Sequence, residues 1–127
     1  MASPRPSDNA EAREGQILNM DSVAGHHVDA AAGVYSSTNF FVQAMIESMR
    51  RELGVNHGIR VNTLSPGVIN TGWAEKVTAP KGRAAAEELN KFAITSEDVA
   101  RAVLFSLNQP EDVTLNDMSI SPTRQHW

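Results

Sequence analysis

The sequence predicts an α/β fold with about three parallel strands and flanking helices. Short apolar runs alternate with longer stretches of helical periodicity, which is typical of a parallel sheet covered by helices. Turns that contain glycine or proline separate the elements. Of the 127 residues, 41% are hydrophobic and 20% are charged, the balance of a folded domain. We assign that domain to residues 15–127 and expect residues 1–14, which include Pro4 and Pro6, to be a flexible lead-in.

The first strand is expected over residues 16–22, where Ile17, Leu18 and Met20 form a short apolar run. Residues 23–33 are small and turn-rich, so they predict a loop.

A long helix is expected over residues 34–53. Val42, Ile46 and Met49 recur at three- and four-residue steps, and charged residues supply the solvent side. Gly54 is the expected end of this helix.

The second half of the chain predicts a strand at residues 59–64, broken by the turn at 65–67, and an alanine-rich helix at 81–92. Thr95 and the acids that follow it are typical of a helix start. A third strand is expected over residues 113–120, where apolar residues alternate.

Composition excludes several classes of protein. The net charge of −4 gives no electrostatic reason to expect nucleic acid or an anionic membrane as a partner. No apolar run approaches the about 20 residues of a membrane span. The absence of cysteine excludes disulfides and thiolate metal sites. We therefore expect a cytoplasmic protein without a metal site.

Three groups of polar residues lie at or after the ends of expected strands. Residues 19–25 (NMDSVAG) close the first strand, 35–39 (YSSTN) open the long helix, and 66–71 (PGVINT) follow the second strand. Because ligands bind at the carboxyl edge of open parallel sheets, these groups predict a binding site at that edge.

The same groups resemble the motifs of the short-chain dehydrogenase/reductase family. That family has a serine in a pattern like N-[IV]-S-S-x-A-G, then Y-x-x-x-K on the next helix, and P-G-x-x-x-T after the following strand. Ser22 and Tyr35 are 13 positions apart, a spacing common in the family. The resemblance covers the C-terminal half of the family's domain and implies a partial Rossmann-like three-layer fold.

The resemblance implies an NAD(P)-dependent oxidoreductase that reduces a carbonyl or oxidises a secondary alcohol. Ser22 would bind the reacting oxygen and Tyr35 would pass the proton. Asn39, at the lysine position, completes the implied catalytic set. The implied cofactor-binding residues are Asn39, Pro66, Gly67, Val68 and Thr71.

Two departures from the family pattern predict an impaired or inactive chain. Asn39 can donate a hydrogen bond but carries no charge, and Asp21 stands where the family has a small residue. The glycine motif that binds the cofactor pyrophosphate is absent from this chain. Asn39 remains open to three interpretations, a functional substitution, a decayed site or a sequence error, with decay or error favoured.

The expected partners are a small-molecule carbonyl or alcohol and further copies of the chain. The family packs its long helix against a second subunit, so the resemblance implies a homo-oligomer formed through residues 34–53. The alternative is a truncated, non-catalytic remnant that self-associates or docks on a full-length relative through an unpaired sheet edge. His26 and His27 are interpreted as a solvated loop pair in preference to substrate contacts.

Overall fold

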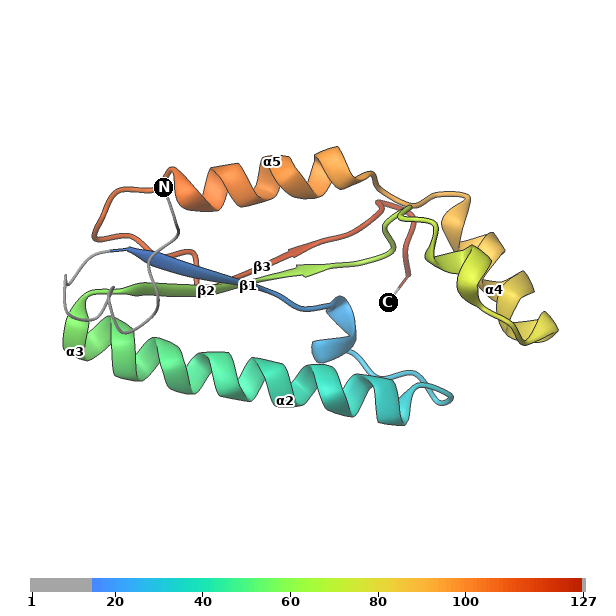
Figure 1. Ribbon diagram of the computed structural model, residues 1–127, viewed down its shortest axis with the longest axis horizontal. Helices are drawn as coiled ribbons and strands as arrows, with labels where there is room; N and C mark the ends of the chain where they lie inside the picture. The colour runs from blue at the N-terminus through green and yellow to red at the C-terminus, as the bar shows by residue number, and fades with distance from the viewer. Residues whose placement is uncertain (1–14, 127) are drawn as a thin grey trace.

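A computed structural model of the chain describes residues 15–126 (Figure 1). The expected flexible lead-in, residues 1–14, lies outside the described residues. The elements follow in the order β1 (Gln16–Met20), η1 (Val23–Gly25), α2 (Gly33–Met49), η2 (Arg50–Gly54), α3 (Val55–His57), β2 (Arg60–Pro66), η3 (Trp73–Lys76), α4 (Pro80–Asn90), α5 (Ser96–Leu107) and β3 (Asp117–Ile120). The described helices include none that is both long and apolar enough to cross a membrane.

The three strands form one parallel sheet in the order β1-β2-β3, which confirms the predicted fold class. β2 is the centre, with Ile17 opposite Val61 and Leu64 opposite Met118. Residues 61–66 are all buried, as expected of a parallel strand covered on both faces. In Figure 1, α2 covers one face of the sheet and α5 covers the other, which gives three layers.

The apolar core lies between α2 and the sheet. Ile46 of α2 packs with Ile59 and Val61, and partly buried side chains of Ile17 and Val42 surround them. These contacts anchor the long helix under the sheet and fix which of its faces points toward β2.

The predicted end of the long helix at Gly54 is wrong. Gly54 has helical backbone angles (φ −70°, ψ −54°), and the helical path continues through the π-helical turn η2 and the short α3. A glycine inside a helix costs only about 1 kcal/mol, so packing overrides it. The helical path ends at Gly58, whose φ of 69° is left-handed.

The opposite face of the sheet is held by polar side chains. Asn62 of β2 is buried and donates to Ser106 Oγ of α5 at 2.6 Å, and Gln16 Nε2 donates to Asn62 Oδ1 at 2.9 Å. The predicted start of α5 at Thr95 is confirmed, because Thr95 and Asp98 form a complete capping box.

Several strand boundaries differ from the prediction. β1 ends at Met20 and not at residue 22, and β2 begins at Arg60 and not at residue 59. β2 continues through Ser65 and Pro66, where a break was expected, because Pro66 pairs with Ile120 and the following Gly67 N–H donates to Ile120 O at 2.7 Å. β3 begins only at Asp117, since the preceding residues turn instead, with Val113 N–H donating to Pro110 O.

Candidate functional site

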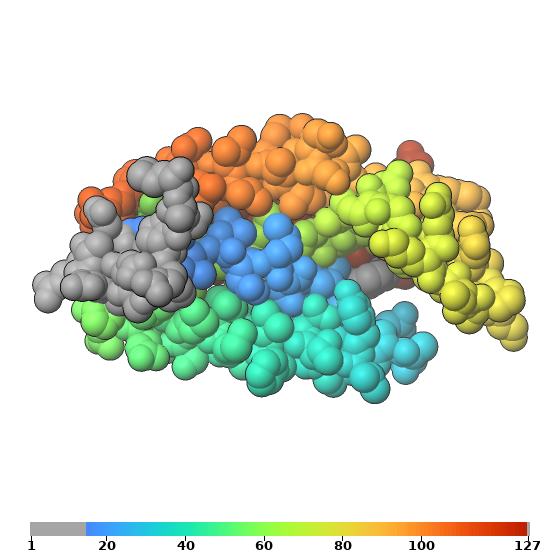
Figure 2. All heavy atoms as spheres, in the orientation of Figure 1, coloured from blue at the N-terminus to red at the C-terminus, as the bar shows by residue number. Residues whose placement is uncertain are grey.

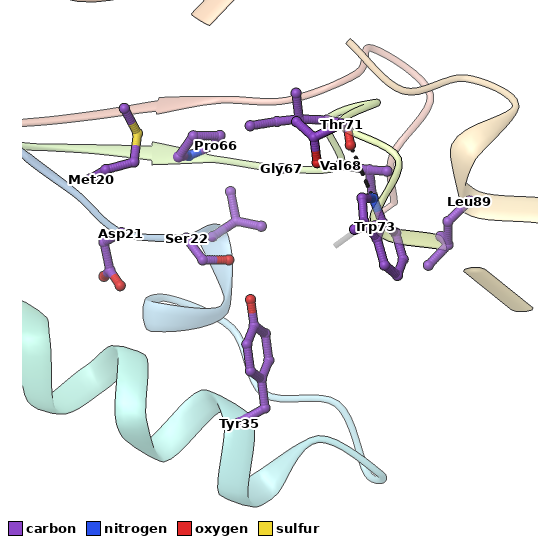
Figure 3. A pocket seen from close by; sticks show the side chains of 12 residues that line it. Met20, Asp21, Ser22, Tyr35, Pro66, Gly67, Val68, Thr71, Trp73 and Leu89 are labelled. Carbon is purple, nitrogen blue, oxygen red and sulfur yellow. Dashed lines mark hydrogen bonds between the residues drawn. The ribbon is translucent and has the colours of Figure 1, made fainter. Parts of the chain in front are cut away.

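A pocket of about 530 Å³ opens beside the carboxyl ends of β1 and β2 (Figure 3). It is built from the end of β1 and the adjoining η1, the start of α2, the turn after β2, η3 and α4. In the space-filling view the surface is hollowed between the start of α2 and α4 (Figure 2). The lining residues are Met20, Asp21, Ser22, Val23, Tyr35, Pro66, Gly67, Val68, Ile69, Thr71, Trp73 and Leu89.

Ser22 and Tyr35 reach this pocket from different elements. Ser22 is the N-cap of η1, and its Oγ accepts a hydrogen bond from Ala24 N–H at 3.1 Å. This local bond fixes the serine rotamer and leaves its hydroxyl proton free to donate elsewhere. Tyr35, on the first turn of α2, directs its hydroxyl toward the same end of the pocket as Ser22 (Figure 3).

Ser36 fixes the direction of the helix start. Its side chain is buried, and its Oγ donates to the backbone oxygen of His27 at 3.2 Å. The neighbouring Tyr35 is 59% exposed and points to the pocket mouth. Sequence reasoning missed Ser36, because its partner lies in a loop without a motif.

The end of β2 and the turn after it bring Pro66, Gly67, Val68 and Thr71 to the pocket wall. Gln125 of the C-terminal segment supports this turn from behind, because its Oε1 accepts from Val68 N–H at 3.0 Å. A side chain at position 67 would collide with Gln125 and would approach Ser121 Cβ to 2.8 Å. Glycine is therefore required here by close approach. Sequence reasoning missed Gln125, since no local signal links it to the turn.

Asn39 lies one helical turn after Tyr35 and is not among the pocket-lining residues. Its Nδ2 donates to the backbone oxygen of Tyr35 at 2.8 Å. The Asn39 amide is therefore hydrogen-bonded within its own helix. The other six predicted site residues line one pocket, namely Ser22, Tyr35, Pro66, Gly67, Val68 and Thr71. The functional roles of all seven residues remain predictions.

A polar cluster beside the pocket joins the residues that follow β1 and η1 to α2, β2 and β3. Gln43 of α2 donates from Nε2 to Asp21 Oδ2 at 2.6 Å and to Ser65 Oγ at 3.1 Å. His26 Nε2 lies 2.9 Å from Asp117 Oδ2, and Ser65 Oγ donates to Asp117 Oδ1 at 3.3 Å. We call these five residues, Asp21, His26, Gln43, Ser65 and Asp117, the polar cluster.

The polar cluster adds to the interpretation of two residues. His26 and His27 are exposed, as predicted for a solvated loop pair, and His26 also pairs with Asp117. Burial raises the pKa of Asp21 above its usual range, although hydrogen bonds from Gln43 and the Ser22 backbone oppose that rise. In the described part of the chain, no group of three or more histidine or carboxylate side chains is arranged to hold a metal ion.

Comparison with known proteins identifies the relatives of this chain. Residues 6–82 match the family model described as short chain dehydrogenase. An uncharacterised oxidoreductase of Staphylococcus saprophyticus is 35% identical over 114 residues, which is 89% of this chain and 46% of that protein. Dehydrogenase/reductase SDR family member 11 of Bos taurus is 38% identical over 117 residues, 88% of this chain and 46% of its own length.

A solved structure supports the same relationship. The closed form of a serine dehydrogenase complexed with NADP+ superposes with a TM-score of 0.80 at 28% identity, covering 96% of this chain and 50% of that one. This chain thus spans about half the length of the relatives that it matches.

Proposed function

Because this chain belongs to the short chain dehydrogenase family, we propose that it forms part of an NAD(P)-dependent oxidoreductase acting on a small carbonyl compound or secondary alcohol. The observation that carries the proposal is that Ser22 and Tyr35 meet in one pocket at the carboxyl edge of the sheet. A small-molecule site is expected at that edge in open parallel sheets. The similar serine dehydrogenase was solved with NADP+, which supports this choice of cofactor class.

The hydroxyls of Ser22 and Tyr35 would have different roles in the reaction. Ser22 Oγ would donate to the substrate oxygen and stabilise the charge that develops there. Tyr35 Oη would donate a proton to that oxygen during reduction, or accept one during oxidation. A bound nicotinamide would supply or take up the hydride. These roles need both hydroxyls within reach of one substrate atom, and their shared direction in Figure 3 supports this arrangement.

The pocket fits the nicotinamide end of such a cofactor. A flat, weakly polar ring suits apolar walls with a few hydroxyls, and Met20 and Val68 provide such walls beside Thr71. We assign Pro66, Gly67, Val68 and Thr71 to this contact. Asn39 would face the ribose only after its amide leaves the Tyr35 backbone oxygen.

We further propose that the chain alone is impaired or inactive. Asn39 brings no positive charge to Tyr35, and its amide is already hydrogen-bonded. Fluorescence titration with NADH and NADPH should show no micromolar binding, and turnover of simple ketones should stay at background. Micromolar binding together with measurable turnover would contradict this proposal.

Asn39→Lys tests the missing charge. A general acid near its working protonation state contributes about 10²–10⁴-fold to the rate. With the cofactor supplied in large excess to overcome its weak binding, the lysine variant should therefore exceed the parent turnover by at least about tenfold. Asn39→Gln is the matched control, because it lengthens the side chain without adding charge. Equal turnover of the two variants would show that the charge is not what the chain lacks.

A second candidate is a non-catalytic chain that acts by association. The side chains of β1 are half-buried or exposed, and β1 has a neighbouring strand on one side only. It lies open between α2 and α5 in Figure 2. On α2, Val34 is 84% exposed and Phe41 68%. These features support self-association through residues 34–53 or docking on a full-length relative.

The cysteine-free composition fits a reducing compartment, and we propose the cytoplasm as the location.

A further inference from the structure

One side-chain amide joins the three parts of the fold that carry the candidate site. Gln43 Nε2, on α2, donates to Asp21 Oδ2 at 2.6 Å and to Ser65 Oγ at 3.1 Å. Asp21 directly precedes Ser22 in the chain. Ser65 is fully buried in β2 and directly precedes Pro66. The two N–H protons of the amide can serve both acceptors, so Gln43 holds two chain segments that lead into the pocket.

The Ser22 loop, residues 22–25, lies directly against this amide. A Cβ on Gly25 would approach Asp21 Oδ2 to 2.6 Å and Gln43 Cγ to 3.1 Å, so the end of the loop packs on both side chains. His26 follows the loop, and its Nε2 lies 3.4 Å from Gln43 Nε2. Gln43 is therefore close to the chain at both ends of the Ser22 loop.

The Asp21 carboxylate belongs to this support. In Figure 3 its side chain points away from the hydroxyls of Ser22 and Tyr35. Tyr35 lies on the same helix as Gln43, about two helical turns earlier. Because Ser22 and Tyr35 stand on different elements, their relative position depends on what ties the Ser22 loop to α2.

We propose that Gln43 is a positioning residue, which holds the Ser22 loop against α2 and so keeps the Ser22 hydroxyl directed to the same part of the pocket as that of Tyr35. Its bond to Ser65 holds the end of β2 in the same frame. The inference rests on the proposed function, because the position of Ser22 matters to the reaction only if Ser22 and Tyr35 act on one substrate.

Two backbone amides distinguish a local effect on the loop from a loss of overall stability. Ala24 N–H reports on the loop, because Ala24 is buried and its N–H donates to Ser22 Oγ at 3.1 Å. Thr63 N–H donates to Asn116 O at 3.1 Å in the buried centre of the sheet and reports on the fold as a whole. Hydrogen exchange of the full chain, labelled with ¹⁵N, measures both amides in one experiment.

Gln43→Met keeps the length of the side chain and removes both N–H donors. Exchange of Ala24 N–H should become at least about tenfold faster, the scale of a lost hydrogen bond to a charged acceptor, and that of Thr63 N–H less than about threefold faster. Gln109→Met is the matched control, because the Gln109 amide donates to Phe105 O at the exposed end of α5, and it should leave the Ala24 rate unchanged. An unchanged Ala24 rate in Gln43→Met, or equal acceleration of both amides, would overturn the proposal.

A donor–acceptor exchange tests the pair of Gln43 and Asp21 directly. Gln43→Glu alone places two carboxylates at hydrogen-bond distance and should also accelerate Ala24 exchange. Adding Asp21→Asn supplies an amide donor opposite the new carboxylate, so the double variant should return the Ala24 rate to within about threefold of the parent. A double variant that exchanges as fast as Gln43→Glu alone would overturn the role of this pair.

The result is separable from the proposed function, because the exchange measurements contain neither a nucleotide nor a carbonyl compound. A failure to bind NADH or NADPH would leave the effect on Ala24 in place. Conversely, cofactor binding together with an unchanged Ala24 rate in Gln43→Met would overturn the positioning role alone.

Discussion

At the residue scale, Gly25 allows η1 to approach α2 and the polar cluster. A Cβ at this position would lie 2.6 Å from Asp21 Oδ2, 3.1 Å from Gln43 Cγ and 3.2 Å from Asn39 O. One of these neighbours is backbone of α2 and cannot move alone. The absence of a side chain at position 25 therefore helps to set the distance between the Ser22 loop and the Tyr35 helix.

Gly25→Ala should lower the free energy of unfolding by about 1–3 kcal/mol, the usual cost of overpacking. Gly33→Ala is the matched control, because a Cβ there meets nothing within 4 Å and alanine favours the helix. Urea denaturation of both variants measures the difference. Equal stability of the two would contradict the packing argument.

Asp21 predicts a pH-dependent stability. Burial raises the pKa of Asp21 above its ordinary 3.8, so the folded chain holds this proton more tightly than the unfolded chain does. The resulting stabilisation is fully present below pH 3.8 and is lost as pH rises through the raised pKa. Asp21→Asn stays neutral, and its stability relative to the parent should therefore increase as pH rises from 3.8 toward neutral. Urea denaturation across this pH range measures the difference in stability between Asp21→Asn and the parent. A difference that stays flat or falls as pH rises would contradict the prediction.

At the scale of elements, α5 shows how one local signal fixes a helix start. Thr95 Oγ1 accepts from Asp98 N–H at 3.1 Å, and Asp98 Oδ2 accepts from Thr95 N–H at 2.8 Å. Hydrogen bonding to the Thr95 backbone lowers the pKa of Asp98 below its usual range. The cap positions α5 over the sheet, where Ser106 meets Asn62.

Thr95→Ala should cost about 1 kcal/mol of stability, because it leaves an N-terminal N–H of α5 without its acceptor. Ser96→Ala, at the first residue of the helix and exposed, is the control and should change stability by less than about 0.5 kcal/mol. Thermal denaturation of the two variants tests the cap. An equal loss of stability in both would show that the loss of the cap is not the cause.

Elements with local signals could be predicted, and boundaries set by distant contacts could not. The periodicity of α2 and the cap at Thr95 depend on residues that are close together in the sequence. By contrast, Pro66 continues β2 because Ile120 lies beside it, and Gly54 remains helical although glycine usually ends a helix. Both outcomes depend on partners that sequence spacing does not reveal.

The candidate site divides in the same way. The motif spacing placed Ser22, Tyr35 and the turn after β2 at one sheet edge, and these residues line one pocket. The polar cluster was not predictable, because its five side chains come from three elements and two connecting segments and share no local pattern. Gln43 illustrates the reason, since its bonds to Asp21 and Ser65 each cross 22 positions.

At the scale of the whole molecule, the outer surfaces of both helix layers carry exposed apolar side chains. Phe41 on α2 is 68% exposed and Phe105 on α5 is 59% exposed. The two phenylalanines are alike in chemistry and exposure but lie on opposite layers (Figure 1). They therefore make a matched pair for asking which layer associates.

Phe41→Arg should shift the chain from oligomer to monomer if copies meet through residues 34–53, because a buried, unpaired guanidinium is costly. Phe105→Arg should leave the oligomer unchanged. Sedimentation velocity of the parent and both variants decides between the layers. A monomeric parent, or dissociation by Phe105→Arg alone, would contradict association through α2.

The parallel sheet also has a consequence for how the chain folds. Neither strand pair can form as a hairpin, and the link from Gln16 to Asn62 spans 46 positions, while that from Gln16 to Ser106 spans 90. The chain must close loops of this length before β2 gains its neighbours. The entropy of loop closure is therefore lost before the contacts of the sheet stabilise the fold. The helices, whose contacts are local, should therefore form first, and the closing of the sheet around β2 should limit the refolding rate.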